Sequence, residues 1–171
     1  MISETHSDNP PVRPLGIATL RRLCALGVPA LLLALAACTK ERDTVPVSCV
    51  REHAGLMAAL RQAPATVVLA DGTRLSRCVS TARTDAELQS LGHSFGRAAD
   101  ALRVRAQSDA SAALQLGYLA GAVRTGARRA SSGIADQLAR RMQQLATLAP
   151  GASAAATAAL TRGLREGERR G

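Results

Sequence analysis

The chain has 171 residues, a formal net charge of +9, one Tyr, one Phe and no Trp. This length favours a single domain and leaves no room for a large two-domain enzyme. The scarcity of aromatic side chains excludes a stacking platform for single-stranded nucleic acid. Arginine outnumbers lysine 21 to 1 and alanine fills 35 positions, a composition typical of GC-rich bacterial genomes.

Residues 1–37 have the pattern of a secretory signal. A polar stretch ends in Arg21-Arg22, and an uncharged, mostly apolar run follows over 23–37. A basic flank, a short apolar stretch and small residues before a cleavage point are the features of a signal peptide. A helix of this length spans about 22 Å, less than the ~30 Å hydrocarbon core of a bilayer. The run is therefore short for a membrane-spanning helix.

The apolar run ends in Leu35-Ala36-Ala37-Cys38, which resembles the lipobox of bacterial lipoproteins. The resemblance implies that residues 1–37 are cleaved off. It also implies that Cys38 becomes the mature N-terminus, with a diacylglyceryl group on sulfur and commonly an N-linked acyl chain such as palmitate. The protein would then be anchored by lipid on the extracytoplasmic side of the cell membrane. The alternatives are an uncleaved signal anchor and, because of Arg21-Arg22, twin-arginine rather than general secretory export.

Two of the four cysteines lie outside the signal and the lipobox, namely Cys49 and Cys78. In an oxidising compartment they are expected to form a disulfide. Closing a loop of roughly 30 residues would stabilise the fold by roughly 3 to 4 kcal/mol. Two free thiols are the alternative. No metal site is expected, because His53 and His93 form no ligand spacing with the cysteines, and no cofactor motif is present.

The beginning of the mature chain is expected to combine a helix with a short β-hairpin. Residues 38–48 form a polar tether, after which the apolar positions of 50–62 predict a helix that Pro64 ends. Over 66–79, two runs of strand-forming residues flank Asp71-Gly72, a pair typical of type I′ turns. The disulfide would join the second strand to the entrance of the first helix.

The rest of the domain, which we place at 49–150, is predicted to be helical. Thr84-Asp85-Ala86-Glu87 is a capping box and starts a helix over 85–107. Further helices are expected after a cap at Ser108 or Asp109, from 134 to 149, and from 153 to 164. Residues 151–171 are predicted to form an Ala-rich helix and a basic tail, and the helix is expected to pack loosely or fray. The predicted fold class is mainly α, a small helical bundle or helical hairpin with one short N-terminal β-hairpin.

Gly92-His93-Ser94-Phe95-Gly96 matches the G-x-S-x-G nucleophile elbow of serine hydrolases. That elbow requires a turn between a strand and a helix, whereas this motif falls inside a predicted helix, and no histidine follows Ser94. We therefore expect Gly92 and Gly96 to serve packing, facing Gly117 and Gly121 in an antiparallel helix pair. No catalytic residue is assigned. The acids of a glycosidase pair are not evident either, because the candidates are scattered: Glu52, Asp71, Glu87, Asp100, Asp109 and Asp136.

The mature chain, 38–171, carries 19 basic and 11 acidic side chains, an excess of eight positive charges. This excess favours anionic lipid headgroups or phosphate-bearing wall polymers as partners. Nucleic acid is not expected, because no binding motif accompanies the charge. The sequence thus predicts a lipid-anchored envelope protein that acts as a non-enzymatic interaction or structural module. The alternative is an envelope hydrolase with an unrecognised active site.

Overall fold

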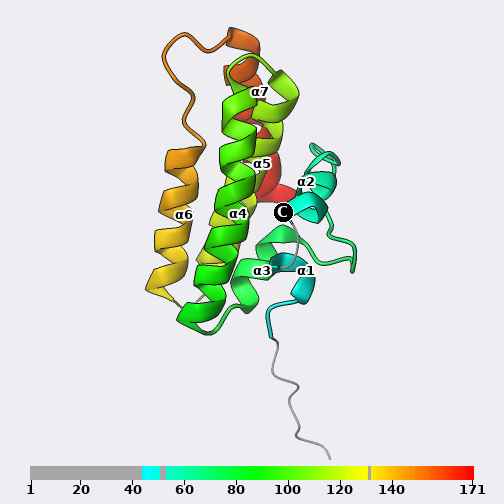
Figure 1. Cartoon of the computed structure of the whole chain (residues 1–171), viewed down its shortest axis with the longest axis vertical. Coiled ribbons are helices and arrows are strands. Elements are labelled where there is room, and N and C mark those ends of the chain that lie inside the picture. Colours follow the sequence, from blue (N-terminus) through cyan, green and yellow to red (C-terminus); the bar gives the residue numbers. More distant parts are fainter. Residues whose placement is uncertain (1–43, 51–52, 131) are drawn as a thin grey trace, which may run out of the picture. The chain divides into compact units, whose positions relative to one another are not determined.

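The computed structural model describes residues 44–171 except 51–52 and 131. The predicted signal, Cys38 and most of the predicted tether lie outside this part of the chain. The described residues form helices and contain no strand, which confirms the mainly helical prediction (Figure 1). The helices are α1 Val47–Val50, α2 His53–Leu60, α3 Leu75–Thr81, α4 Asp85–Ala106, α5 Ala110–Arg129, α6 Gly133–Leu145 and α7 Ala154–Arg170.

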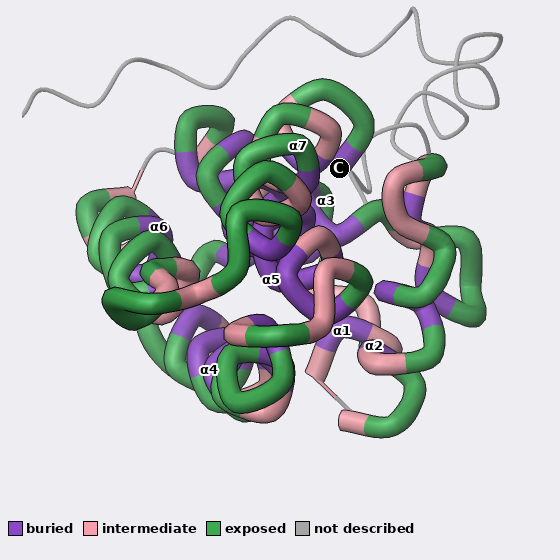
Figure 2. The backbone as a smooth tube through the Cα atoms, turned by 90° about the horizontal axis from the view of Figure 1, so that it is seen from above, coloured by how far each residue is buried: buried purple, intermediate pink, exposed green. Residues whose placement is uncertain are grey.

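Helix α5 is the centre of the body, with α3, α4, α6 and α7 packed around it (Figure 2). Fourteen of its residues are buried. Many of these are alanine or glycine, so α5 contributes little apolar side-chain volume for its length. The larger core side chains come from several helices and include Tyr118, Phe95, Leu102, Leu116 and Met142. The core therefore depends on close approach of helices as well as on large apolar residues.

The closest approach joins α5 to α7. A Cβ atom at Gly117 would overlap the carbonyl oxygen of Leu160, and one at Gly163 would overlap that of Leu114. Gly121 and Gly167 make equivalent contacts one turn further along. Glycines spaced by four residues lie on one face of a helix, so two such faces let the backbones meet. The expectation that the C-terminal helix packs loosely is wrong, and α7 extends to Arg170.

The predicted partner of the first glycine pair is also wrong. Gly92 and Gly96 face α6, where a Cβ on Gly92 would lie 3.6 Å from Leu138 Cδ1. Gly117 and Gly121 face α7 instead. Small residues allow close packing but do not specify which helix packs there, and the glycine face of α7 formed by Gly163 and Gly167 was available to α5.

The predicted β-hairpin over 66–79 is present only as its turn. Leu69 N–H donates to the carbonyl oxygen of Thr73 at 2.9 Å, Gly72 has φ +80°, and Val68 and Arg74 form an isolated antiparallel bridge. The second run forms α3 instead. The reason is burial, because Leu75, Cys78 and Val79 share one helical face and are buried in the core, whereas a two-stranded hairpin gains little by itself.

The predicted helix starts are largely confirmed. Thr84 caps α4 with the reciprocal bonds of a capping box to Glu87, and Asp109 caps α5 by accepting from the N–H groups of Ser111 and Ala112. Ser153 caps α7. Where one helix was predicted over 50–62, the structure has α1 and α2, which lie on either side of residues 51–52. Helix α6 ends at Leu145, four residues before the predicted end.

Candidate functional site

The serine motif is not a nucleophile elbow. Residues 92–96 lie in the middle of α4, and Phe95 is fully buried. The Ser94 hydroxyl donates to the carbonyl oxygen of Val50 at 3.1 Å, which joins α4 to α1. His93 lines a groove of about 460 Å³ between α4 and α6, and Ser94 does not line it. The motif therefore lacks the strand, the exposed nucleophile and the base that acyl transfer requires.

The candidate acids that the structure describes have structural roles or stand apart. Asp71 holds a turn, Glu87 and Asp109 cap helices, and Asp100 lies 3.9 Å from Arg103. Asp136 lies in the first turn of α6, where a negative charge favours the helix dipole. Glu52 falls outside the described residues. No group of three or more His, Cys, Asp or Glu side chains able to hold a metal ion occurs among the described residues.

The predicted disulfide is confirmed. Cys49 in α1 and Cys78 in α3 are bonded, with their Cα atoms 5.7 Å apart, and both residues are buried. A Cβ at Gly126 would overlap the Ser76 carbonyl oxygen, so α3 also packs closely on α5. The disulfide and this close contact fix the position of α3 between the start of the body and the end of α5.

An open groove of about 840 Å³ borders α3, the turn that precedes it and the end of α5. Four exposed arginines and one acid line it, together with Pro46 from the start of the described chain: Arg74, Arg77, Arg83, Arg129 and Asp71. Among the described residues, the guanidinium groups of Arg74, Arg83 and Arg129 form no ion pair with a carboxylate. The groove therefore has a positive excess and charged groups available to a ligand.

Asp71 does not neutralise this groove by pairing with an arginine. Its carboxylate accepts hydrogen bonds from the Ser48 hydroxyl at 2.6 Å and from Thr73 N–H at 3.0 Å. The bond from Ser48, and then that from Thr73, lowers the pKa of Asp71. The acid is thus ionised at neutral pH and committed to the turn. It ties α1 to the loop that carries Arg74.

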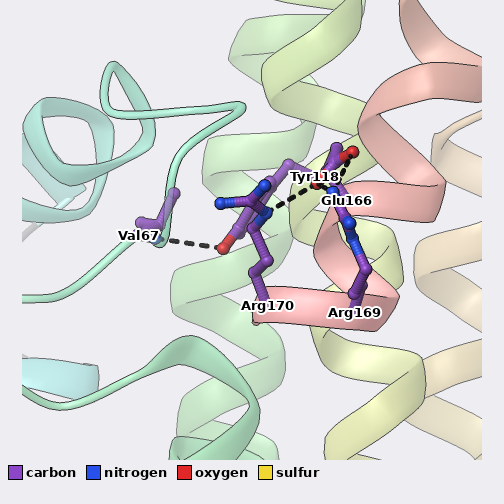
Figure 3. Close-up of polar contacts among 5 residues, drawn as sticks. All are labelled: Val67, Tyr118, Glu166, Arg169 and Arg170. Atoms are coloured by element: carbon purple, nitrogen blue, oxygen red, sulfur yellow. Dashed lines mark hydrogen bonds and ion pairs between the residues drawn. The ribbon is translucent and has the colours of Figure 1, made fainter.

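Tyr118 fixes the other side of this loop. It is fully buried in α5, and its hydroxyl oxygen accepts a hydrogen bond of 3.0 Å from Val67 N–H (Figure 3). Burial is the main cause that raises the pKa of Tyr118. Beside it, Glu166 binds both Arg169 and Arg170, and the hydrogen bond from Arg169 is the main cause that lowers the pKa of Glu166.

These observations single out the arginine groove as the candidate site, because it combines a concave surface with unpaired charge held on a cross-linked framework. No protein-family model, curated protein or solved structure matches the chain. Within the described residues, no helix has both the length and the apolar character to cross a membrane. The groove was not predicted from the sequence, which placed Arg74 and Arg77 in the second strand of the expected hairpin and assigned no site to Arg83 or Arg129.

Proposed function

We propose that this chain is a lipid-anchored protein of the bacterial cell envelope, whose helical body acts as a non-enzymatic binding or structural module. The observation that carries the proposal is the lipobox-like Leu35-Ala36-Ala37-Cys38 at the end of the apolar run. Lipid on Cys38 would place the body on the extracytoplasmic side of the membrane. The partners that its charge favours are anionic lipids or wall polymers.

The disulfide supports this location. Disulfides persist in oxidising compartments such as the bacterial periplasm and are rare in the cytosol. Cys49 and Cys78 cross-link α1 and α3, two helices of four and seven residues that are too short to be stable alone. A body that uses such a cross-link is suited to an exported protein.

The roles of the polar and charged side chains among the described residues support a binding or structural module. Ser94 bonds a backbone carbonyl, and Glu87 and Asp109 cap helices. The groove presents guanidinium groups, which bind anions and do not act as acids or bases near neutral pH. Binding is therefore the chemistry that these residues favour.

The anchor is tested by producing the full chain in a bacterial host and analysing the N-terminus of the membrane fraction by mass spectrometry. We expect Cys38 as the first residue, carrying diacylglycerol. Cys38→Ala should accumulate as a precursor that retains residues 1–37. Cys24→Ala is the matched control, since it removes a cysteine from the apolar run without changing the lipobox, and it should be processed normally.

An unmodified N-terminus, or cleavage at another residue in the wild-type chain, would contradict the anchor. Normal processing of Cys38→Ala would contradict it equally, because lipoprotein cleavage requires the modified cysteine.

A further inference from the structure

We propose that the groove formed by Arg74, Arg83 and Arg129 binds the phosphate of an anionic phospholipid headgroup in the membrane to which the chain is anchored. This inference rests on the proposed function, because the lipid on Cys38 would bring the groove to the bilayer.

The chemistry of the groove favours a phosphate ligand. A guanidinium group is planar, permanently charged and able to donate two parallel hydrogen bonds to phosphate oxygens. The three arginines come from separate places in the sequence, namely the residue before α3, the link between α3 and α4, and the last residue of α5. All three line one groove, which therefore offers several guanidinium donors to a phosphate with its tetrahedrally arranged oxygens.

The backbone around the groove is held in place by a disulfide and by close helix packing. Arg74 is adjacent to the helix that carries Cys78, and the disulfide holds that helix to α1. Gly126, three residues before Arg129, brings α5 against the backbone of α3. The backbone positions of Arg74 and Arg129 are thus set by packing and a covalent bond. This framework reduces the ordering that binding a headgroup would require.

The groove is joined to the proposed anchor by a short stretch of chain. Pro46 lines the groove and follows Cys38 by eight residues. Even a fully extended chain covers only about 3.5 Å per residue, so the two are separated by at most about 28 Å. A lipid on Cys38 would therefore keep Pro46, and the groove that Pro46 lines, within this distance of the anchor.

The experiment uses the full chain, purified from membranes and reconstituted into neutral phosphatidylcholine vesicles or into vesicles that also contain phosphatidylglycerol. Phenylglyoxal modifies accessible arginines, and mass spectrometry measures the rate at each one. We expect Arg74, Arg83 and Arg129 to react about fivefold more slowly in the anionic vesicles, the factor that corresponds to the ~1 kcal/mol an arginine gains at an anionic surface. Added salt should reduce this protection.

Three exposed arginines outside the groove, Arg61, Arg140 and Arg162, serve as internal references and should change little. Equal rates in the two kinds of vesicle would overturn the proposal. An equal slowing of groove and reference arginines would also overturn it, because it would show a general attraction of the basic surface. A third sample contains neutral vesicles and soluble glycerol phosphate. If the groove arginines are fully protected from phenylglyoxal in this sample, the site binds a soluble phosphate instead of a lipid.

Matched variants separate the groove from the total charge. Arg74→Gln/Arg83→Gln/Arg129→Gln and Arg61→Gln/Arg140→Gln/Arg162→Gln each remove three positive charges. Hydrogen exchange of the α3 amides is compared between anionic and neutral vesicles. It should be slower in anionic vesicles for the wild type and for the Arg61/Arg140/Arg162 variant. It should be the same in both kinds of vesicle for the Arg74/Arg83/Arg129 variant. Equal slowing in both variants would contradict the site, and circular dichroism checks that both are folded.

The anchor is scored independently by sedimentation with neutral vesicles and by the mass of the N-terminus. A chain that fails to sediment with neutral vesicles, yet shows groove protection in anionic ones, would refute the lipid anchor and retain the groove. Sedimentation with both kinds of vesicle and no groove protection would retain the anchor and refute the groove.

Discussion

The α5–α7 pair and the α1–α3 segment are held in the body by different means. The pair is formed by two long helices whose glycines let the backbones touch over several turns. The α1–α3 segment has short helices and loops, and it is fixed by a disulfide, by the Asp71 hydrogen bonds and by the hydroxyl of Tyr118.

The difference shows how a chain with few large apolar residues becomes stable. Long helices with small side chains gain dispersion energy from many close contacts, each of them weak. Short segments cannot collect enough such contacts, because helices of four to eight residues are marginal by themselves. They depend instead on a few specific bonds. The candidate groove lies where the specific bonds are concentrated, so its geometry should respond to changes that leave the helix pair intact.

The largest effect is expected from removal of the disulfide. Cys49→Ala/Cys78→Ala should lower the free energy of unfolding by roughly 3 to 4 kcal/mol, because the unfolded chain is no longer constrained by the loop. Chemical denaturation measures the loss. Reduced wild-type protein is the control and should resemble the variant.

Hydrogen exchange then locates the change. Amides of α2 and α3 should lose protection before those of α5 and α7. Uniform loss of protection along the chain would show that the two regions are not stabilised separately.

The next effect is on the helix pair. Gly163→Ala should destabilise by about 1 to 3 kcal/mol, because the added methyl group overlaps the backbone of Leu114 and forces α5 and α7 apart. Gly92→Ala is the matched control, a mid-helix glycine whose added Cβ would meet only Leu138 at ordinary contact distance. It should be neutral or stabilise by up to ~1 kcal/mol through helix propensity. Thermal unfolding measures the stability of both variants. Equal changes in stability would contradict close packing at Gly163.

The sequence predicted the long helices well because local signals define them. The Thr84–Glu87 capping box and the Asp109 cap are complete within four residues, and the helices begin where these signals stand. The pairing of helices was predicted wrongly because it is decided across the fold. Gly117 and Gly121 could pack on any small face, and only the three-dimensional arrangement shows that Gly163 and Gly167 provide it.

The candidate site was predicted in part. The Cys49–Cys78 bond followed from counting cysteines, whereas the arginine groove was missed. In the expected strand, Arg74 and Arg77 would point to opposite faces because their separation is odd. In the structure, the chain turns into α3 directly after Arg74, and both arginines line one groove with the distant Arg129. The helical spacing of Leu75, Cys78 and Val79 was the signal in the sequence that could have predicted a helix over 75–81 instead of a strand.

Tyr118 connects the two regions, and its variant should have an intermediate effect. Tyr118→Phe retains the ring but leaves the buried N–H of Val67 without its acceptor, which should cost about 1 to 2 kcal/mol. Ser94→Ala removes a partly buried side-chain bond to Val50 and should cost less, ~0.5 to 1.5 kcal/mol. Denaturant unfolding measures both. A Tyr118→Phe variant as stable as the wild type would show that the loop before α3 is held without this bond.

The smallest expected effect is on the stability of the fold at acidic pH. The salt dependence of this effect should differ between the α1–α3 segment with its neighbouring Glu87 and the α5–α7 pair with Glu166. Glu87 has a pKa lowered mainly by hydrogen bonds from the N–H groups of Arg83 and Thr84, whereas Arg169 lowers that of Glu166. A lowered pKa in the folded state adds stability at neutral pH that is lost as pH falls below the unfolded value, about 4.5 for Glu.

Glu87→Gln should therefore flatten the fall in melting temperature on acidification, and Glu166→Gln should do the same at low salt. High salt should erase the contribution of Glu166, because its partner is an exposed charge, and should largely preserve that of Glu87, whose donors are uncharged amides. Thermal melts across the acidic range at two salt concentrations measure this. An equal salt response of the two variants would show that both carboxylates act through net charge rather than through the bonds that differ between the regions.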